Sequence, residues 1–194
     1  MLETRPIAGT RPRGSSGIYD IELSKELINS DKEKAEHLML VDLERNDISK
    51  VCKPGSVRVD EMMTIETYAH VHHIVSNISG EIKKGIFPGD VIKSVFPGGT
   101  ITGCPKVRCM EILGELEKQG RGPYTGSFGY ISHNGNMDIN ILIRTILKEN
   151  DDLFFRAGGG IVADSKPIDE YNETVNKAKA LFTAANDALR FENN

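Results

Sequence analysis

Apolar residues return every three or four positions in several stretches of the chain, a spacing typical of helices. It predicts a helical stretch over about 21–49, with a break and a new N-cap at Ser30-Asp31. A short helix is predicted to start at Pro88 and to reach about residue 96. Two further helices are predicted over 106–118 and 167–191. Their inner sides are expected to be Val107, Met110, Ile112, Leu113 and Leu116 in the first, and Tyr171, Val175, Ala178, Phe182 and Ala185 in the second.

Between the helices, β-branched residues with partial alternation predict strands. The predicted strands cover residues 57–59, 64–82, 126–131, 138–148 and 153–157, and a hairpin turn at 133–136 joins the third to the fourth. Residues 5–17 are rich in Gly, Pro and Arg, which argues against a helix there, and 97–105 is expected to be a loop. Strands and helices do not alternate regularly, so the pattern predicts an α+β fold, with a mostly antiparallel sheet packed against helices.

Composition narrows the class of protein. The 194 residues allow one large domain or two very small ones. With 24 Lys and Arg against 28 Asp and Glu, the chain has no basic footprint that would indicate a nucleic-acid partner. No run approaches the roughly 18 apolar residues of a membrane span, and residues 1–6 do not resemble a signal peptide. Three cysteines without a regular framework favour a reducing compartment, so a cytoplasmic protein is expected.

Two pairs of glutamates could bind a metal. Glu33 and Glu36 are three residues apart on one predicted helix, and Glu170 and Glu173 have the same spacing on another. If the two helices faced each other across a cleft, their carboxylates would suit Mg²⁺, which usually takes one or two protein carboxylates. Such pairs are also common on solvated helix faces, so their spacing alone leaves both interpretations open.

Three glycine-rich segments, 6–10, 97–100 and 157–160, could expose backbone N–H groups to a carboxylate or phosphate. Taken singly, each segment is more typical of a structural turn. The chain has neither the Walker spacing nor G-x-G-x-x-G, which disfavours a nucleotide site.

Histidine and arginine add two further candidates. His70 and His72 form an H-x-H pair, but a third zinc ligand at a recognisable spacing is missing. His73 could act as a general acid or base, or serve only in packing. Arg144 lies in an apolar predicted strand, so it should face a carboxylate, either of a ligand or in an ion pair inside the sheet. Tyr124 offers a phenol for the same ligand.

Seven ordered segments together resemble the C-terminal half of the chorismate-binding enzymes. This family includes anthranilate synthase component I, aminodeoxychorismate synthase component I and isochorismate or salicylate synthases. The matching segments are residues 6–14, 34–47, 68–76, 96–108, 124–130, 157–165 and 169–177. They span nearly the whole chain, so the resemblance is far more specific than any single motif.

The resemblance implies a metal site and a substrate site. Glu36 and Glu173 would hold Mg²⁺, with Glu33 and Glu170 close by. The two carboxylates of chorismate would be bound by Gly9, Thr10, Tyr124, Arg144, Gly158, Gly159 and Gly160. The catalytic histidine near the C4 hydroxyl would be His73, and Thr100 and Lys177 would be further pocket residues with a catalytic role.

The resemblance also implies that residues 1–194 are the C-terminal portion of a larger chorismate-binding domain. The N-terminal half of the family fold, with a catalytic glutamate, is expected outside this chain, so the chain alone should be weakly active or inactive. A glutamine amidotransferase partner would supply ammonia.

The loop around Phe96-Pro97-Gly98-Gly99 and Ile101-Thr102 resembles aminodeoxychorismate synthase, which makes 4-amino-4-deoxychorismate for p-aminobenzoate and folate synthesis. Ala8 and Thr100 instead resemble anthranilate synthase, which makes anthranilate and pyruvate for tryptophan synthesis. An inactive module of such an enzyme is the third alternative.

Overall fold

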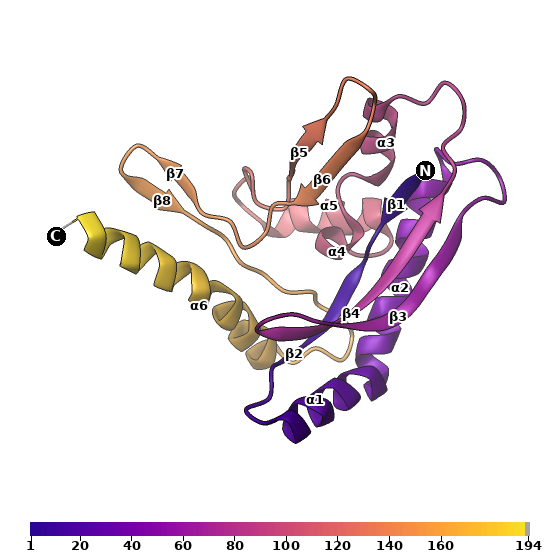
Figure 1. Ribbon diagram of the computed structural model, residues 1–194. Coiled ribbons are helices and arrows are strands. Elements are labelled where there is room, and N and C mark those ends of the chain that lie inside the picture. Colours follow the sequence, from indigo (N-terminus) through magenta and orange to yellow (C-terminus); the bar gives the residue numbers. More distant parts are fainter. Residues whose placement is uncertain (193–194) are drawn as a thin grey trace. The chain divides into compact units, whose positions relative to one another are not determined.

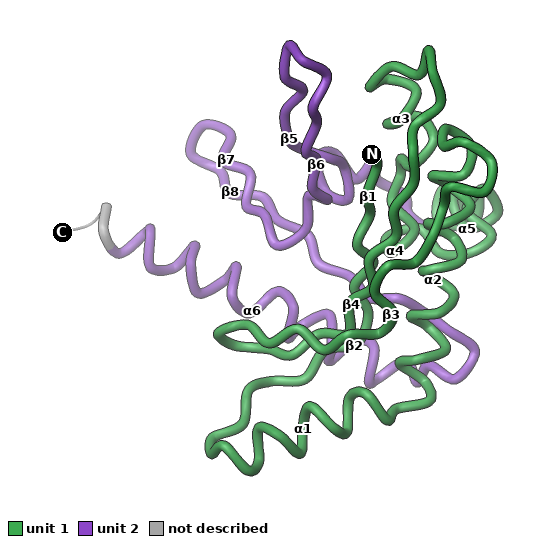
Figure 2. The backbone as a smooth tube through the Cα atoms, turned by 45° about the vertical axis from the view of Figure 1, so that its right-hand side comes forward, with its two compact units in different colours: residues 1–116 green, residues 117–194 purple. Residues whose placement is uncertain are grey.

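The computed structural model describes residues 1–192 of the chain, and Figure 1 shows the order of its helices and strands. The chain divides into two compact units, residues 1–116 and the part that begins at residue 117, which are drawn in different colours in Figure 2. Over residues 1–192, no helix is long and apolar enough to cross a bilayer. The expectation that residues 1–194 belong to one partial domain of a larger fold stays a prediction.

Unit 1 is built on an antiparallel sheet whose central strand is β4 (Val71–Gly80). β3 (Arg58–Thr67) pairs along one edge of β4. β1 (Leu2–Thr4) and β2 (Ile7–Pro12) follow each other along the other edge. Neither β1 nor β2 was predicted, and the predicted strand 64–82 is divided between β3 and β4 by a turn. The Tyr68 amide donates to the Val71 carbonyl across that turn at 2.8 Å.

Two consecutive helices of unit 1, α1 (Gly17–Asn29) and α2 (Asp31–Ser49), confirm the predicted break at Ser30. The Ser30 hydroxyl accepts a hydrogen bond from the Glu33 amide at 3.4 Å, as an N-cap residue does. α2 packs against the sheet, and the buried core cluster joins Val41 and Ile48 of α2 to Ile78 of β4 and to Cys52. This packing fixes the helix that carries Glu33 and Glu36 against the strand that carries His73.

Three shorter helices complete unit 1: α3 (Pro88–Val95), α4 (Gly99–Thr102) and α5 (Lys106–Leu116). The predicted helices at 88 and 106 are confirmed, whereas α4 lies inside the segment expected to be a loop. The expected inner side of α5 is wrong, because no residue of α5 is buried and Val107 and Leu116 are 71% and 72% exposed. Within its unit α5 contacts mainly α4, which is too short to cover an apolar helix face.

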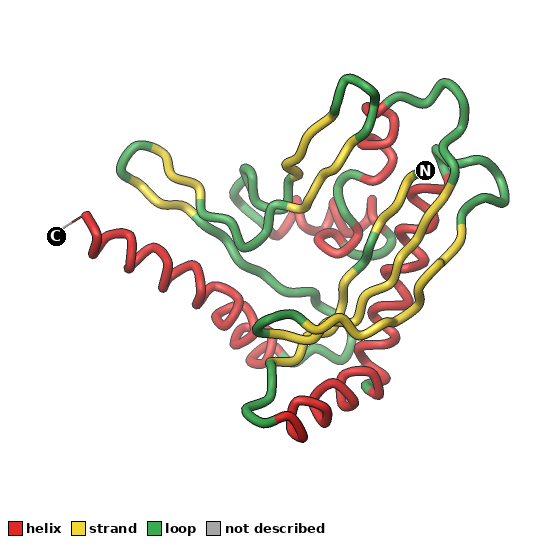
Figure 3. Tube along the Cα trace, in the orientation of Figure 1, coloured by secondary structure: helices red, strands yellow, loops and turns green. Residues whose placement is uncertain are grey.

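Unit 2 contains two hairpins and a long helix (Figure 3). β5 (Ser127–Ile131) pairs with β6 (Met137–Ile141), and β7 (Leu147–Glu149) pairs with β8 (Asp152–Phe154). The turn predicted at 133–136 is confirmed, with Gly135 in the left-handed region at φ +84°. The predicted strand 138–148 is broken between β6 and β7, where Arg144 has φ +53°. All strand pairs in residues 1–192 are antiparallel, which confirms the predicted α+β class.

The last helix, α6 (Pro167–Glu192), confirms the predicted position but not the predicted buried stripe. Tyr171, Val175 and Phe182 are 65%, 48% and 58% exposed, whereas Leu181 is buried. Phe182 packs edge-on against Phe155, with ring centroids 4.8 Å apart. The two-stranded hairpins of unit 2 offer too little surface to bury a helix of this length.

A half-buried carboxyl of α2 predicts a pH-dependent stability for unit 1. Glu44 accepts a hydrogen bond from the Thr4 hydroxyl of β1, and its burial raises its pKa from 4.5 to about 7. Protonated Glu44 therefore contributes to the free energy of unfolding. This contribution is fully present below pH 4.5 and is lost as pH rises through 7. Glu44→Gln keeps the shape without the charge, so it should raise the free energy of unfolding at pH 8 by at most about 3 kcal/mol and have little effect at low pH.

Urea unfolding of the parent and of Glu44→Gln across this pH range measures the difference. Glu22→Gln, at an exposed position of α1, is the matched control. A difference between the parent and Glu44→Gln that stays constant with pH would contradict the prediction.

Candidate active site

The candidate site in unit 1 begins at a bulge in β2. The pairing of β2 with β4 shifts by one residue between Ala8 and Thr10, and Gly9 lies there with φ +76°, a conformation that favours glycine. The bulge brings Thr10 opposite His73 of β4. Bulges of this kind re-aim the side chains that follow them. Gly9 thus sets the direction of Thr10.

Thr10 and Gly9 orient the His73 ring. The Nδ1 atom of His73 lies 2.9 Å from the Thr10 hydroxyl oxygen and 3.3 Å from the Gly9 carbonyl oxygen. A carbonyl oxygen only accepts, so we assign the proton of the neutral ring to Nδ1. The Tyr68 ring stands edge-on to His73, with centroids 5.9 Å apart. In this tautomer, Nε2 of His73 keeps its lone pair and can exchange a proton with a ligand.

Glu33 approaches the same bulge from α2. A Cβ atom added to Gly9 would lie 3.0 Å from Glu33 Oε2 and 2.9 Å from Leu27 Cδ1, so the close approach requires glycine. The other carboxylate oxygen of Glu33 accepts from Arg11 at 3.3 Å. Unit 1 therefore brings together four of the predicted residues: Gly9, Thr10, Glu33 and His73.

Glu36 and Thr100 complete the predicted residues of unit 1. Glu36 is half-buried and lies three residues beyond Glu33 on α2. Thr100 is exposed on α4, and within residues 1–192 no hydrogen bond joins its side chain to His73 or Thr10. The neighbouring Gly99 is buried, and a Cβ atom there would lie 2.6 Å from Leu43 Cδ2 of α2. The absence of a side chain at Gly99 thus lets α4 lie close against α2.

In unit 2, the glycine-rich loop 158–160 lies against the start of α6. A Cβ atom added to Gly159 would lie 3.4 Å from Glu170 Oε2, 3.9 Å from Glu173 Oε1 and 3.8 Å from Lys177 Nζ. A Cβ atom at Gly158 would lie 3.0 Å from the Tyr124 hydroxyl oxygen. Unit 2 thus brings its predicted carboxylates, its lysine and its phenol to one loop.

The charged side chains of α6 have defined partners. Lys177 Nζ pairs with Glu173 Oε1 at 2.5 Å. Glu170 is buried, and its Oε1 accepts from the Ser165 hydroxyl at 2.6 Å. The Ser165 hydroxyl itself accepts from the Val162 amide at 3.0 Å. Sequence reasoning missed Ser165, although a serine five residues before a candidate ligand is a reasonable signal for a supporting hydrogen bond.

Arg144 does not form the ion pair inside the sheet that was one of the two interactions expected for it. Its guanidinium donates to the Lys177 carbonyl of α6 at 2.9 Å, and within residues 1–192 it forms no ion pair. The ion pair inside the sheet is therefore wrong, because the left-handed backbone at Arg144 ends the strand and turns the residue to α6. A non-glycine residue in this region is strained, and such strain gathers at functional sites. The remaining donors of Arg144 are available to a ligand.

The H-x-H pair has a different role from zinc binding. His72 is buried, with Nε2 2.9 Å from Asp20 Oδ1 and Nδ1 2.8 Å from the Thr67 hydroxyl. Arg13 donates twice to Asp20 at 2.8 Å and holds the pKa of that carboxyl well below its usual range. His72 thus joins α1 to the end of β3. The sequence offers no local signal for this contact, because Asp20 and His72 are far apart in the chain.

The metal site stays a prediction. Within residues 1–192, no group of three or more His, Cys, Asp or Glu side chains lies close enough to hold a metal ion. Glu36 belongs to unit 1 and Glu173 to unit 2, so neither unit alone contains the predicted pair. Each unit does offer two glutamates on one helix, and carboxylate oxygens are the protein ligands that Mg²⁺ prefers.

These features correspond to a known class of protein. The family model described as chorismate binding enzyme matches residues 1–183, and the chain belongs to this family of chorismate-utilising enzymes. Over 183 residues it is 57% identical to anthranilate synthase component 1 of Aquifex aeolicus, a match that covers 94% of this chain and 37% of the relative. Over 181 residues it is 55% identical to aminodeoxychorismate synthase component 1 of Bacillus subtilis, covering 93% of this chain and 38% of the relative.

Solved structures support the same fold. The crystal structure of anthranilate synthase component I from Streptococcus pneumoniae matches with a TM-score of 0.83 at 41% identity, over 91% of this chain and 39% of that chain. The menaquinone-specific isochorismate synthase of Escherichia coli matches with a TM-score of 0.84 over 93% of this chain and 41% of that chain. At 23% identity the second likeness shows the fold alone. The chain therefore spans less than half the length of each of these relatives.

Proposed function

We propose that this chain supplies part of the active site of an enzyme that adds a nucleophile to C2 of chorismate, with loss of the C4 hydroxyl, and produces an aminated ring. The observation that carries this proposal is the arrangement around loop 158–160, where the side chains of Tyr124, Glu170, Glu173 and Lys177 lie beside Gly158 and Gly159. A glycine-rich loop leaves its backbone amides accessible to a ligand. Such amides bind carboxylates well. Chorismate has two carboxylates, so this loop is suited to one of them.

Arg144 and Tyr124 would bind the substrate beside the loop. A guanidinium can bind a carboxylate with two parallel hydrogen bonds, and one N–H of Arg144 is already held by the Lys177 carbonyl. This anchored geometry lowers the entropy that Arg144 loses when it binds a ligand. The Tyr124 hydroxyl, next to Gly158, can donate to the same carboxylate.

His73 would act as the general acid for the C4 hydroxyl. A hydroxyl leaves readily only when it receives a proton, and an imidazolium can donate one from Nε2. The Gly9 carbonyl and the Thr10 hydroxyl can accept from Nδ1–H both before and after this transfer. The ring would therefore keep one orientation while its charge changes.

Mg²⁺ is the proposed cofactor, and the chain's carboxylates fit it. Glu36 and Glu173 would hold the ion, with Glu33 and Glu170 nearby, and Ser165 holds Glu170 in place. When bound, the ion would supply positive charge that grips the C1 carboxylate and assists departure of the C4 hydroxyl. Mg²⁺ commonly keeps some water and substrate oxygens as ligands, so a full set of protein ligands is not required.

The proposed product is 4-amino-4-deoxychorismate, made with ammonia from a glutamine amidotransferase partner. Support comes from Gly99 and Ile101-Thr102, which resemble the enzymes that do not eliminate pyruvate; Gly99 lies against Leu43. Ala8 is buried in β2 and offers no amine for covalent attack at C2. Water or ammonia would therefore be the transient nucleophile at C2. Ammonia would then attack C4 in a second displacement that expels the C2 nucleophile and gives the product.

Anthranilate and pyruvate are the alternative products. Ala8 and Thr100 resemble anthranilate synthase, and the relative from Aquifex aeolicus carries that name at 57% identity. Both reactions begin at C2 with loss of the C4 hydroxyl, so His73, Arg144 and the glutamates do not discriminate between them. The difference would depend on whether the pocket places a base for elimination of pyruvate.

A product assay separates the two. This chain, joined in turn to the unmatched portion of the Bacillus subtilis relative and of the Aquifex aeolicus relative, gives two completed enzymes for the assay. With chorismate, Mg²⁺ and ammonium but no lyase, both should accumulate 4-amino-4-deoxychorismate, measured by chromatography. Stoichiometric anthranilate and pyruvate from both would establish the alternative. A product that follows the added portion would show that this chain does not determine it.

The same assay tests whether the chain is an inactive module by itself. It matches only 37% and 38% of these two relatives, and catalysis requires the whole constellation of groups to be in place. The chain alone should therefore turn over far more slowly than either completed enzyme. A rate of about 1 s⁻¹ or faster from the chain alone would contradict this expectation.

A further inference from the structure

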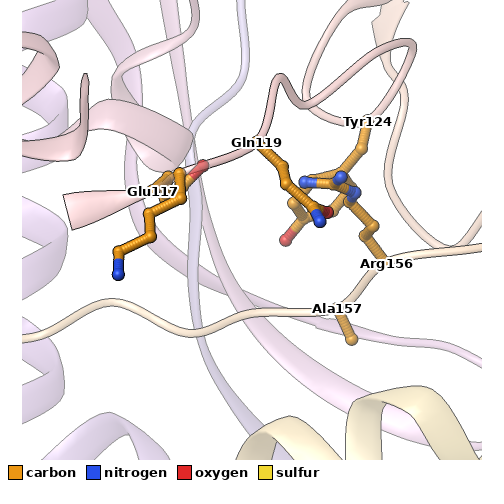
Figure 4. A pocket seen from close by; sticks show the side chains of 6 residues that line it. Glu117, Gln119, Tyr124, Arg156 and Ala157 are labelled. Carbon is orange, nitrogen blue, oxygen red and sulfur yellow. The ribbon is translucent and has the colours of Figure 1, made fainter. Parts of the chain in front are cut away.

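Unit 2 contains a recess that sequence reasoning did not find. It has a volume of about 430 Å³ and is lined by Glu117, Lys118, Gln119, Tyr124, Arg156 and Ala157 (Figure 4). Ala157 directly precedes loop 158–160, and the Tyr124 hydroxyl reaches the position next to Gly158. The recess therefore adjoins the glycine-rich loop.

Among the residues that line the recess, the only carboxylate is Glu117, and it is already ion-paired with Arg121. Glu117 accepts from Arg121 Nε at 2.9 Å and from Arg121 Nη2 at 2.6 Å, a bidentate pair that lowers the pKa of Glu117. The Arg121 guanidinium also lies over the Tyr124 ring, 5.9 Å from its centroid. Glu117 thus holds Arg121 against Tyr124. Because its charge is paired with Arg121, Glu117 repels an incoming anion less.

Two cations of the recess are not held by a direct contact to a carboxylate. Within residues 1–192, neither Arg156 nor Lys118 forms a hydrogen bond or an ion pair through its side chain. Figure 4 shows Arg156 reaching toward Tyr124 and Gln119. Arg156 and Arg121 both act to lower the pKa of Tyr124, against the effect of its burial, which agrees with their closeness to the phenol. Lys118 and Arg156, with Arg121 beside them, share one lining carboxylate, Glu117, whose pKa Arg121 and Arg156 both help to lower. The recess therefore has an excess of positive charge.

We propose that this recess binds a carboxylate and that Arg156 is its principal ligand-binding residue. The guanidinium can bind a carboxylate through two hydrogen bonds, while the Gln119 amide and the Tyr124 hydroxyl can donate further ones. A planar ligand would also gain contact with the Tyr124 ring. The class of ligand is thus a small planar carboxylate.

The identity of that carboxylate rests on the proposed function. Gly159 lies beside Glu170 and Glu173, the side of the loop proposed for the metal and the C1 carboxylate of chorismate. Arg156 lies on the Tyr124 side of the loop. We therefore assign the enolpyruvyl carboxylate to Arg156, in addition to Tyr124 and Arg144. Arg156 would then help the site to prefer substrates with two carboxylates.

Benzoate, a planar monocarboxylate, tests the recess independently of turnover. In NMR titrations of the 194-residue chain, benzoate should shift the Arg156 Nε–H and Tyr124 ring signals saturably. Arg156→Gln should weaken binding roughly 10- to 100-fold, the expected loss for hydrogen bonds to a charged group. Arg108→Gln is the matched control, because Arg108 is an arginine of α5 that pairs with Glu111 at 2.7 Å. Unshifted signals, or equal affinities of the parent and Arg156→Gln, would overturn the proposal.

A titration with chorismate separates the inference from the proposed function. It uses the parent chain, Arg156→Gln and Arg108→Gln, and one completed enzyme with and without Arg156→Gln. Chorismate affinity that falls with Arg156→Gln supports both. Benzoate binding that depends on Arg156, without any chorismate binding, would keep the recess as a carboxylate site but contradict the proposed function and the enolpyruvyl assignment. Chorismate binding that is unaffected by Arg156→Gln would keep the proposed function and overturn the assignment of Arg156.

Discussion

Glu36→Gln and Glu173→Gln, made separately in a completed enzyme, are each expected to remove most of the amination activity and to weaken its dependence on Mg²⁺. Each replacement keeps the size of the side chain but removes a charge from a site for a hard cation. The metal supplies several kcal/mol of charge stabilisation, so the loss should be about 100-fold or more. Steady-state rates measured over a range of Mg²⁺ concentrations test the expectation.

Glu61→Gln is the control for these two variants. Glu61 lies on β3 and is a partly exposed partner of Arg5, with the nearest N and O atoms 3.6 Å apart, and it has no proposed role in metal binding. Its rate and Mg²⁺ dependence should match those of the parent. If Glu36→Gln and Glu173→Gln also titrate with Mg²⁺ as the parent does, the proposed metal ligands are wrong. If only Glu173→Gln responds, the ion belongs to the α6 carboxylates alone.

His73→Gln is expected to lower kcat of the same enzyme by roughly 10²–10⁴-fold, the usual contribution of a general acid or base. Glutamine can still donate to the Gly9 carbonyl, so the fold of the bulge should survive. The pH profile of kcat should lose the limb that reports the imidazole. His70→Gln, at an exposed position beside the β3–β4 turn, is the control and should leave kcat and its pH profile unchanged.

Thr10→Val gives the same prediction a second readout. This variant removes the hydroxyl 2.9 Å from His73 Nδ1 but leaves the Gly9 carbonyl as an acceptor. It should lower kcat less than His73→Gln does, because the Gly9 carbonyl still orients the ring. A His73→Gln enzyme with the parent's kcat and pH profile would show that His73 is only a packing residue.

The sequence predicted elements that carry their own local signals. Ser30 is a good N-cap before a charged first turn, and Gly135 suits a hairpin turn, so both boundaries were correct. β1 and β2 were missed because they are short and depend on pairing with β4 instead of on an apolar alternation of their own. The break at Arg144 was missed because a left-handed arginine is stabilised by the Lys177 carbonyl, 33 residues further along the chain.

The same limit applies to the candidate site. Motifs identified Gly9, Thr10 and His73, but the approach of Glu33 to Gly9 depends on how α2 packs against the sheet. Arg156 carries no motif signal, and its importance follows only from its place beside Tyr124 and from its lack of a direct ion pair. The faces of α5 and α6 that were predicted to be buried are exposed, which shows a related limit. A periodic pattern identifies an apolar helix face but not the element that covers it.

The extra residue in β2 has a consequence for how this chain tolerates changes of length. Successive side chains in a strand point to opposite faces, so one added or removed residue inverts every side chain on one side of the change. Gly9 is the exception, because it is the unpaired residue of the bulge. Its deletion would leave Ala8 opposite Ile74 and Thr10 opposite His73 in a regular ladder, so no side chain of β2 would change face. What would be lost is the local bend of the strand, and with it the direction in which the Thr10 hydroxyl approaches the histidine.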